Sequence, residues 1–570
     1  MKTLMNETGK IANLNLVALA AAIALALAFG PVLAATIVVP SGSNPEIQDG
    51  IDAASPGDTV SLKKSCGTGS TCGFGGLYHQ GVEIDKKLTL NCNGAILDGD
   101  VPSGKSGSIE GGAPIAGPIQ LGGDGIEVDG DGATIVNCTV RNFNSDGIDV
   151  DADSVTIRNN TLINNGNGQG DGLELDGKDF LIERNTASGN LDSGFDVDGN
   201  DGIVRRNHST ANEDGFHIQG NRVLVLNNRA FRNNEEGFEV DGDDDGLIDV
   251  INNRAETNDR VGFKIDEVKK STISRNFSRG NEEEGFDIDA DDTTIERNVA
   301  MFNGDDDGEE GFDIDGDDLT INRNVAIGGS EDGFDIDGED NVITRNRAMF
   351  NREDGFDIRC GSGNPPPPGC GPIMHNRAIG NTDEGFELSD IDETTVSHNV
   401  SKRNEDEGFE IDDADTTTFI HNLAMDNGEQ GFRIFDGTKN TFERNRSFGN
   451  AGDGFKITSE STLTMIKNTA KKNKEDGFDI DNDTDTVIMD RNKAIRNTNT
   501  GIENDGGPDT TLTDNTMKGN GLDLAGKGDE TTETGTCDGD AGDAATDGGG
   551  NVFANAGGFD TCVPDKSDSD

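Results

Sequence analysis

One six-residue pattern, Glu-Gly-Phe-Asp-Ile-Asp at positions 284–289, recurs about every 22 residues along most of this chain. The sequence holds 17 copies between Asp124 and Asp505, and the hydrophobic residue at the centre of each copy follows a glycine. In every copy but the last, Val, Ile or Leu stands two residues after that centre, so apolar and polar residues alternate as in a half-buried strand. Each copy therefore predicts a strand with one face in the core. The central residues are Ile126, Ile148, Leu173, Phe195, Phe216, Phe238, Phe263, Phe286, Phe312, Phe334, Phe356, Phe386, Phe409, Phe432, Phe455, Phe478 and Ile502.

A repeat of this length predicts a single elongated solenoid rather than several globular domains. Neighbouring units must stack, because one unit is too short to bury its apolar face alone. The composition is acidic, with 109 Asp and Glu against 47 Lys and Arg and a net charge of -62. Such acidity can indicate disorder, but the regular Phe and Ile positions give every unit a surface to bury. The charge argues against nucleic acid and anionic membranes as partners and favours cations.

The N-terminal segment has the features of an export signal. Lys2 and Lys10 precede an apolar run at about 17–29, and small residues follow a Gly-Pro break. Residues 1–35 are therefore predicted to be a signal peptide, and we expect a secreted or periplasmic protein with no membrane contact after cleavage. An uncleaved membrane anchor is the alternative, although the apolar run is short and rich in alanine.

Eight cysteines, an even number, fit disulfides in an exported protein. Cys92 and Cys138 stand in similar sequence contexts, so they are predicted to stack in adjacent turns. A zinc site is the weaker interpretation because no paired Cys-x-x-Cys motif occurs. The pairs that lie close in sequence or in the same end segment are Cys66 with Cys72, Cys360 with Cys370, and Cys537 with Cys562.

The segment before the repeats predicts a cap on the open end of the solenoid. Residues 46–54 fit a short amphipathic helix, and a turn and an extended segment follow it. With the apolar stretches 76–78, 82–84 and 87–90, this opening resembles the N-terminal cap and first turn of exported right-handed parallel β-helix proteins. Their family is the pectate-lyase-like superfamily, which includes the periplasmic copper-maturation proteins of nitrous-oxide reductase systems. The resemblance implies an all-β, right-handed parallel β-helix of about 17 or more rungs with a cap at each end.

These features divide the chain into four parts. The signal peptide at 1–35 is followed by the N-terminal cap and first turns at 36–123, and the β-helix repeats occupy 124–520. From 521 to 570 the chain is rich in Gly, Asp and Thr and is predicted to form a C-terminal cap.

Two columns of asparagine accompany the repeats. The stretch 295–303 shows the pattern complete: an aliphatic residue, a basic residue and Asn, with a second Asn five residues after the first. An Asn side chain at a fixed turn position can bridge amide and carbonyl groups of the turns above and below it. Both columns are therefore predicted to be structural.

The polar face of the repeated strand is mostly carboxylate. We name three columns by their place in the pattern: column one precedes the glycine, column two follows the central residue, and column three stands two residues after column two. Of the 17 copies, 13, 13 and 12 are acidic in these columns. Because the apolar residues point inward, all three columns are expected along the outside of the solenoid. Unit charges about 4.8 Å apart repel by roughly 1 kcal/mol per pair even in water, and bound positive ions would offset that repulsion.

Calcium suits this arrangement. Ca²⁺ takes six to eight oxygen ligands, and the columns supply Asp and Glu oxygens within and between strands. The alternative is a solubilising acidic face of the halophile type, with diffuse counterions and no specific site. The predicted calcium ligands are Glu284, Asp287, Asp289, Glu310, Asp313, Asp315, Asp332, Asp335 and Asp337.

The acidic columns break in two places. In the first break, His217 and Gln219 occupy columns two and three. In the second, Arg433, Phe435 and Lys456 replace acidic residues on two consecutive turns. These breaks predict either a functional site or local relief of charge, with cationic residues neutralising carboxylates across neighbouring turns.

The second break resembles the mixture of charges used by pectate-lyase-type enzymes, where calcium binds a uronate carboxylate and Arg or Lys removes the adjacent proton. The resemblance implies that Arg433 is the catalytic base and that Lys456 contacts a substrate carboxylate. Composition counts against a carbohydrate enzyme, because the chain has no Trp and one Tyr, whereas sugar clefts usually offer exposed aromatic faces. The implied metal ligands are Glu410, Asp412 and Asp479.

Three consecutive turns carry histidine directly before the first Asn, at His375, His398 and His421. Stacked imidazoles could share a transition metal. The resemblance to copper-maturation proteins favours such a site. The alternative is that His replaces the Arg or Lys that most other turns carry there.

The sequence predicts an exported calcium-binding parallel β-helix protein with a structural or binding role outside the cytoplasm. Its expected partners are divalent cations and an extracellular polysaccharide. The second hypothesis is a calcium-dependent lyase or epimerase of acidic polysaccharide, and the third is transition-metal handling in the periplasm. Whether the protein is an enzyme stays open at this stage.

Overall fold

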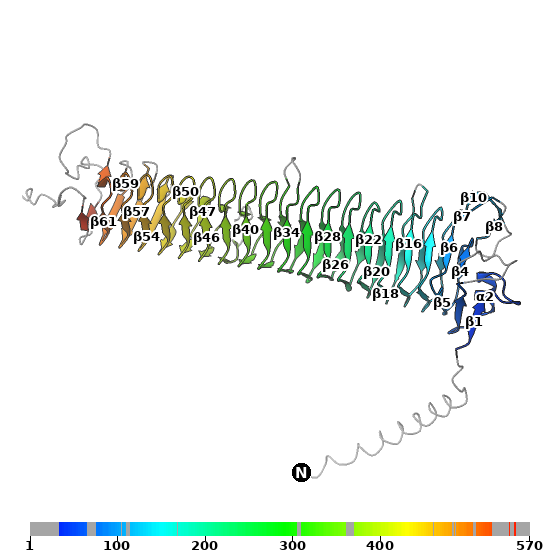
Figure 1. Ribbon diagram of the computed structural model, residues 1–570. Coiled ribbons are helices and arrows are strands. Elements are labelled where there is room, and N and C mark those ends of the chain that lie inside the picture. The colour runs from blue at the N-terminus through cyan, green and yellow to red at the C-terminus, as the bar shows by residue number, and fades with distance from the viewer. Residues whose placement is uncertain are drawn as a thin grey trace, which may run out of the picture.

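The chain forms a long rod of stacked turns, with the N-terminal elements at one end (Figure 1). The computed structural model describes residues 34–64, 76–103, 105–109, 115–167, 169–304, 309–360, 370–459, 461–481, 484, 486–504, 509–526, 546–547 and 552–554. Within these residues, one short helix, α2 (Ile47–Ala53), accompanies a right-handed parallel β-helix of about 19 turns. The predicted fold class is confirmed.

Each complete turn contributes one strand to each of three parallel sheets. A representative turn contains β32 (Phe286–Asp291), β33 (Thr294–Glu296) and β34 (Val299–Met301). The first of these belongs to a 19-stranded sheet, which we name the acidic sheet, and the others belong to sheets of 21 and 20 strands. Equivalent residues pair between turns, for example Phe286 with Phe312.

The 21-stranded sheet begins with β1 (Thr36–Val39), β2 (Thr59–Leu62) and β5 (Thr89–Asn91), and its last strand is β63 (Thr546–Asp547). The 20-stranded sheet runs from β3 (Leu77–Tyr78) and β6 (Ile96–Asp98) to β64 (Val552–Ala554). The strands of the acidic sheet are β4 (Val82–Ile84), β11 (Ile126–Val128), β14 (Ile148–Asp151), β17 (Leu173–Lys178), β20 (Phe195–Asn200), β23 (Phe216–Gly220), β26 (Phe238–Gly246), β29 (Phe263–Lys269), β32, β35 (Phe312–Asp315), β38 (Asp335–Asp337), β41 (Asp357–Arg359), β44 (Glu387–Ser389), β47 (Phe409–Asp415), β50 (Phe432–Thr438), β53 (Phe455–Ile457), β56 (Phe478–Ile480), β59 (Thr500–Asn504) and β62 (Leu522–Gly526).

Two strands of the acidic sheet lie beyond the 17 copies identified in the sequence. Strand β4 precedes the first copy and β62 follows the last, and both pair in parallel with their neighbours. Each follows a glycine, but Gln80 and Asn520 stand where most copies have an acidic residue. Strand β4 is the apolar stretch 82–84 of the predicted first turns, whereas β62 lies in the segment that is predicted to be the C-terminal cap.

The core is a column of stacked side chains. Successive Phe rings from Phe195 to Phe478 lie parallel, with centroids 4.7–5.0 Å apart. All of these Phe side chains are buried, as is the Ile, Val or Leu that follows two residues later. Each ring covers the next at the spacing of the strands, so one residue type at one register position builds a continuous core.

Close packing of turns explains the glycine before each central residue. A Cβ atom on Gly285 would lie 2.5 Å from the carbonyl oxygen of Gly311 and 2.6 Å from the amide nitrogen of Asn303. No side chain fits at those distances. The glycine is therefore required by the approach of the adjacent turn.

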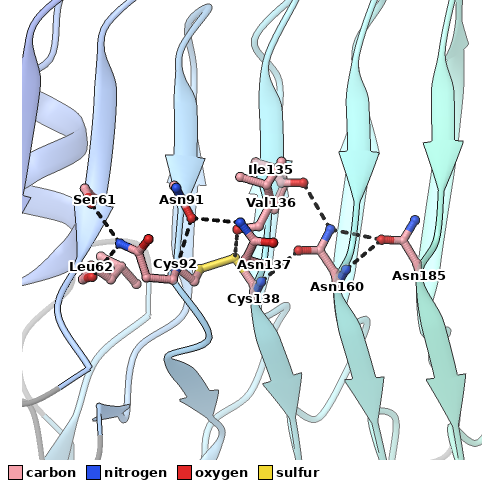
Figure 2. Close-up of a disulfide and its surroundings, with 11 residues drawn as sticks. Ser61, Leu62, Asn91, Cys92, Ile135, Val136, Asn137, Cys138, Asn160 and Asn185 are labelled. Carbon is pink, nitrogen blue, oxygen red and sulfur yellow. Dashed lines mark hydrogen bonds between the residues drawn. A yellow bond between two sulfur atoms is a disulfide. The ribbon is translucent and has the colours of Figure 1, made fainter.

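The asparagine columns form hydrogen-bonded ladders, as predicted (Figure 2). Asn160 donates its backbone N–H to Asn185 Oδ1 at 2.9 Å, and its Nδ2 donates to the carbonyl oxygen of Ile135 at 3.0 Å. Equivalent bonds link the later turns, and the Asn side chains of the first column are buried. Leaving such backbone groups unpaired would cost about 1–3 kcal/mol each, so the ladders stabilise the bends.

The disulfide between Cys92 and Cys138 joins adjacent turns at the start of one of these ladders, where Cys138 donates its N–H to Asn160 Oδ1 (Figure 2). This predicted pair is confirmed, and so is the pair Cys360–Cys370. The predicted pairs Cys66–Cys72 and Cys537–Cys562 lie outside the described residues, and so does nearly all of the predicted signal peptide.

Helix α2 covers the N-terminal end of the solenoid, close to its predicted range. Its first amide group, on Ile47, donates to Gln80 Oε1 at 2.9 Å. The Gln48 side chain bonds to both backbone groups of Glu83 in β4, which leaves that strand without an open edge there.

Candidate cation-binding face

Two files of carboxylates run along the outer face of the acidic sheet. The register pairs Asp287 with Asp313 in column two and Asp289 with Asp315 in column three. Adjacent turns here lie 4.7 Å apart, measured between the Phe rings beneath them. The structure thus brings six of the predicted ligands into neighbouring positions: Asp287, Asp289, Asp313, Asp315, Asp335 and Asp337.

Column one does not lie on this outer face, and the expectation that all three columns project outward is wrong for it. The column-one residue lies in the bend before the strand, and its side chain points along the rod toward the next turn. Asp332, for example, accepts the N–H of Asp354 on the next turn at 2.6 Å. Eight members of the column are 3–9 % exposed: Asp146, Asp171, Glu236, Asp332, Asp354, Glu407, Asp453 and Asp476. Five of these accept a backbone N–H of the next turn, namely Asp146, Asp332, Asp354, Asp453 and Asp476.

Burial and mutual repulsion raise the pKa values of several of the predicted ligands. Partial burial first, and then neighbouring carboxylates, raise the pKa of Asp287 to about 6 and that of Asp313 to about 7. The same causes raise the pKa of Glu310 to about 9, with Glu331 as its main neighbour. At neutral pH these groups therefore require either a proton or a nearby cation.

Fixed cations interrupt the outer files at positions that the sequence reasoning did not single out. Lys264 Nζ lies 2.8 Å from Glu239 Oε1 on the preceding turn. Arg359 Nη1 lies 3.7 Å from Asp335 Oδ2, at the end of the predicted calcium cluster. Both were visible in the sequence as basic residues in columns two and three.

The first predicted break is an ion pair. His217 Nδ1 lies 3.0 Å from Asp196 Oδ1 on the preceding turn. This hydrogen bond raises the pKa of His217 to about 9, although partial burial opposes the shift. His217 therefore carries a positive charge at neutral pH and neutralises Asp196.

The second predicted break places its residues in one file. Column two reads Glu410, Arg433, Lys456 and Asp479 on four consecutive turns. Arg433 Nη1 lies 2.9 Å from Glu410 Oε2 and 3.6 Å from Glu407 Oε1. Both basic residues are thus paired with carboxylates, as the charge-relief alternative predicts, and the catalytic roles of Arg433 and Lys456 stay predictions.

Lys456 is a poor general base in this environment. Its Nζ lies 3.2 Å from Asp479 Oδ2. Burial would lower its pKa, but the pairing with Asp479 outweighs burial and raises it above the ordinary value. A lysine that removes a proton at neutral pH requires the opposite shift.

Carboxylate oxygens converge in groups of three at five places among the described residues. In each group one oxygen from every member lies within 4.8 Å of the others. The sequence reasoning missed these groups because most members lie in the bends, and their adjacency depends on the register between residues 21–28 positions apart on neighbouring turns. The groups are Asp146, Asp171 and Glu174; Asp214, Glu235 and Glu236; Glu284, Glu309 and Glu310; Asp383, Glu384 and Asp406; and Glu384, Glu407 and Glu410.

The three histidines form a ladder on the opposite side of the Asn column from the core. The ring centroids of His375 and His398 lie 4.9 Å apart, and those of His398 and His421 lie 5.0 Å apart. All three side chains are exposed. Burial, His398 and Arg345 lower the pKa of His375, so its imidazole is neutral at neutral pH and its nitrogens can bind a metal.

A family model described as the right-handed β-helix region matches residues 117–248, 371–447 and 425–555 of the sequence. A model described as a periplasmic copper-binding protein, NosD, matches residues 195–304. No curated protein matches the sequence. Among the described residues, none of the helices is long and apolar enough to cross a membrane.

Solved structures with similar architecture include three carbohydrate-related or phage proteins of low identity. The periplasmic alginate epimerase AlgG is 14 % identical, with a TM-score of 0.23, over 69 % of this chain and 77 % of that one. The A-module of the mannuronan C-5 epimerase AlgE4 from Azotobacter vinelandii is 15 % identical, with a TM-score of 0.22, over 86 % and 95 %. Tailspike protein 3 of bacteriophage CBA120 is 12 % identical, with a TM-score of 0.27, over 67 % and 57 %.

Proposed function

The chain belongs to the right-handed β-helix family, and from that premise we propose that it is an exported rod that binds calcium along its acidic sheet and has a structural or binding role outside the cytoplasm. Export is supported by the match to a periplasmic protein family over residues 195–304. It is also supported by the disulfides Cys92–Cys138 and Cys360–Cys370, since disulfides persist mainly in oxidising compartments.

The convergence of carboxylate oxygens carries the calcium proposal. Five groups of three oxygens within 4.8 Å cannot all be ionised at neutral pH without compensation. Arginines compensate two of the groups: Arg260 lies 2.9 Å from Glu236, and Arg433 lies 2.9 Å from Glu410. Ca²⁺ provides the missing compensation in the others, because it accepts several carboxylates at once in flexible geometry.

A rod with regularly spaced bound calcium suits a role in binding acidic polymers. Calcium that keeps some ligand positions open to solvent can bridge the protein and a uronate carboxylate. This interaction would make an extracellular acidic polysaccharide a partner without any chemical step, and it requires no role for Arg433 as a base.

Isothermal titration calorimetry of the metal-free protein tests this function. At low salt, the protein is expected to bind several calcium ions, and binding should persist in excess magnesium. Titration with sodium chloride to the same ionic strength is the control. Heat that is the same for calcium and sodium would mean a diffuse counterion atmosphere and would overturn the proposal.

The histidine ladder supports a second candidate function, which is binding of a transition metal. Imidazoles spaced 4.9 and 5.0 Å apart on a rigid sheet can supply nitrogen ligands from adjacent turns to one ion. The match to a copper-binding family, although it covers other turns, is in line with this candidate. Titration with Zn²⁺ and Cu²⁺ should show a site that His398→Ala abolishes; equal binding by the variant would remove this candidate.

A further inference from the structure

One of the five groups differs from the others in its burial. Asp146 lies just before β14 and Asp171 just before β17, and each is 7 % exposed. Glu174, the second residue of β17, is exposed and lies above them. One oxygen from each of the three carboxylates lies within 4.8 Å of the other two, so two buried carboxylates face one that opens to solvent.

Asp171, a member of this group, has a buried carboxylate oxygen without a donor. Its Oδ1 atom has no hydrogen-bond partner among the described residues. Asp146, by contrast, is satisfied: its Oδ1 accepts the N–H of Asp171 at 2.6 Å, and its Oδ2 accepts the hydroxyl of Ser145 at 3.1 Å. A buried carboxylate oxygen without a donor is costly, and native structures rarely leave one unless something binds it.

No fixed cation neutralises this group. In the part of the chain that the structure describes, no Lys, Arg or His forms an ion pair with Asp146, Asp171 or Glu174. The register places further carboxylates, Asp149 and Asp196, on either side of Glu174. Burial first, and then Asp196, Asp146, Asp192 and Glu174, raise the pKa of Asp171 to about 9, which indicates how strongly its surroundings disfavour an uncompensated charge.

We propose that Asp146, Asp171 and Glu174 form a specific calcium site, tighter than any other on the acidic sheet, with Asp171 Oδ1 as a ligand. This inference rests on the proposed function, since it locates the principal site of the calcium binding proposed there. Waters complete the six to eight ligands that Ca²⁺ requires.

The spacing of turns favours calcium over magnesium at this site. Asp146 and Asp171 stand on adjacent turns, about 4.8 Å apart. Two oxygens on opposite sides of one Ca²⁺ are separated by about 4.6–5.2 Å, whereas around Mg²⁺ the separation is about 4.0–4.2 Å. The spacing of the turns lies in the calcium range, and the carboxylate oxygens of the group lie within 4.8 Å of one another.

Calorimetric titration of three proteins with calcium tests the proposal: the wild type, Asp171→Asn and Asp179→Asn. Asp179 is exposed on the same turn and belongs to none of the five groups, so its variant removes the same charge as a matched control. We expect Asp171→Asn to weaken the tightest site at least tenfold and to leave the weaker sites in place. Asp179→Asn should bind as the wild type does, and excess magnesium should not displace calcium from the tight site in either the wild type or this control.

The titrations distinguish failure of this site from failure of the proposed function. Unchanged tight binding in Asp171→Asn overturns this site but leaves the proposed function standing, whereas a wild type that binds no calcium overturns both. Circular dichroism without calcium should show Asp171→Asn folded, because Asn has the same shape and removes the uncompensated charge. If that variant nevertheless fails to fold, Glu174→Gln at the exposed member of the group decides the question: it must lower tight binding, and wild-type affinity would contradict the site.

Discussion

Near Asp171 the carboxylates of adjacent turns face one another without an ion pair to any basic residue that the structure describes, whereas around Arg433 they face the basic residues of the next turn. Both regions pair their strands in the same register over a buried apolar column, which is Ile148 and Leu173 near Asp171 and Phe432 and Phe455 around Arg433. Arg433 lies 2.9 Å from Glu410, and Lys456 lies 3.2 Å from Asp479, so this region carries its own counterions. The apolar core therefore determines the shape of the rod in both regions. Each stretch of the outer face can balance its negative charge either with basic side chains or with bound cations.

The largest expected effect comes from removing the fixed counterion in the second region. Arg433→Ala leaves Glu407, which is 4 % exposed, and Glu410 without their cation. Removing one partner of a buried pair costs about 3–5 kcal/mol, and because Arg433 is 43 % exposed we expect about 1–3 kcal/mol without calcium. Urea denaturation measures this loss.

Calcium should restore part of that stability, because the variant would make the second region resemble the first. Arg446→Ala is the control, since Arg446 is exposed and lies on another sheet. If Arg433→Ala were as stable as the control without calcium, the assignment of Arg433 as a counterion would be wrong. Release of unsaturated uronate from pectate or alginate by the wild type, lost in Arg433→Ala, would instead support the lyase hypothesis.

The reverse change should give the first region its own counterion. The register places Glu174 between Asp149 and Asp196, so Glu174→Lys sets a cation between two carboxylates. We expect an increase of about 1 kcal/mol in the free energy of unfolding without calcium, together with a smaller rise in melting temperature on adding calcium. Glu174→Gln separates removal of a charge from its reversal, and a calcium response in Glu174→Lys as large as in the wild type would contradict the comparison.

The first region should also make stability depend on pH. Burial and then neighbouring carboxylates raise the pKa of Asp149 and Glu174 to about 7 and that of Asp171 to about 9. Their unfolded values are about 4, so the native state holds more protons between these limits. Stability without calcium should therefore be greatest below about pH 4 and fall as pH rises toward about 9.

Melting temperatures at low salt in EDTA, measured across this range, check the sign of the effect. Asp171→Asn should flatten the upper part of the curve, because it removes the carboxyl with the highest pKa of the three. Stability that rises between about pH 5 and 8 would show that these carboxylates are stabilised as anions.

The smallest effect is expected at Lys456, the other basic residue of the second region. Lys456→Met removes the ion pair with Asp479 but keeps the apolar stem of the side chain. Among the described residues Lys456 pairs with one carboxylate, whereas Arg433 pairs with two, and at 31 % exposure solvent partly screens the pair, so the loss should be below about 1 kcal/mol. A loss as large as that of Arg433→Ala would mean that the four-residue file acts as one network, which a double variant would reveal as non-additivity.

Much of the rod follows from local sequence rules. The Phe at each centre and the Asn at each bend recur at one register, so stacking turns on a common axis predicts both the aromatic column and the Asn ladders. The Cys92–Cys138 disulfide follows from the same argument, because both cysteines occupy one position in adjacent turns.

The candidate site was less predictable for two physical reasons. Alternation of inward and outward side chains holds only within a strand, and column one lies in the bend, where Asp332 turns toward a backbone amide. Moreover, Asp146 and Asp171 are 25 residues apart, so their proximity depends on the length of the turn between them. Column one directly precedes a glycine and consists mostly of Asp and Glu. This combination was the available sequence signal that its side chains bind backbone groups.

Differential scanning calorimetry at low salt tests most directly whether bound positive ions make the acidic sheet stable. The metal-free wild type is compared with the protein in calcium and in sodium chloride at matched ionic strength. The account predicts a rise in melting temperature that calcium produces, that EDTA reverses and that sodium does not reproduce, with most of the rise absent in Asp171→Asn. Equal melting temperatures in EDTA, calcium and matched sodium would contradict it.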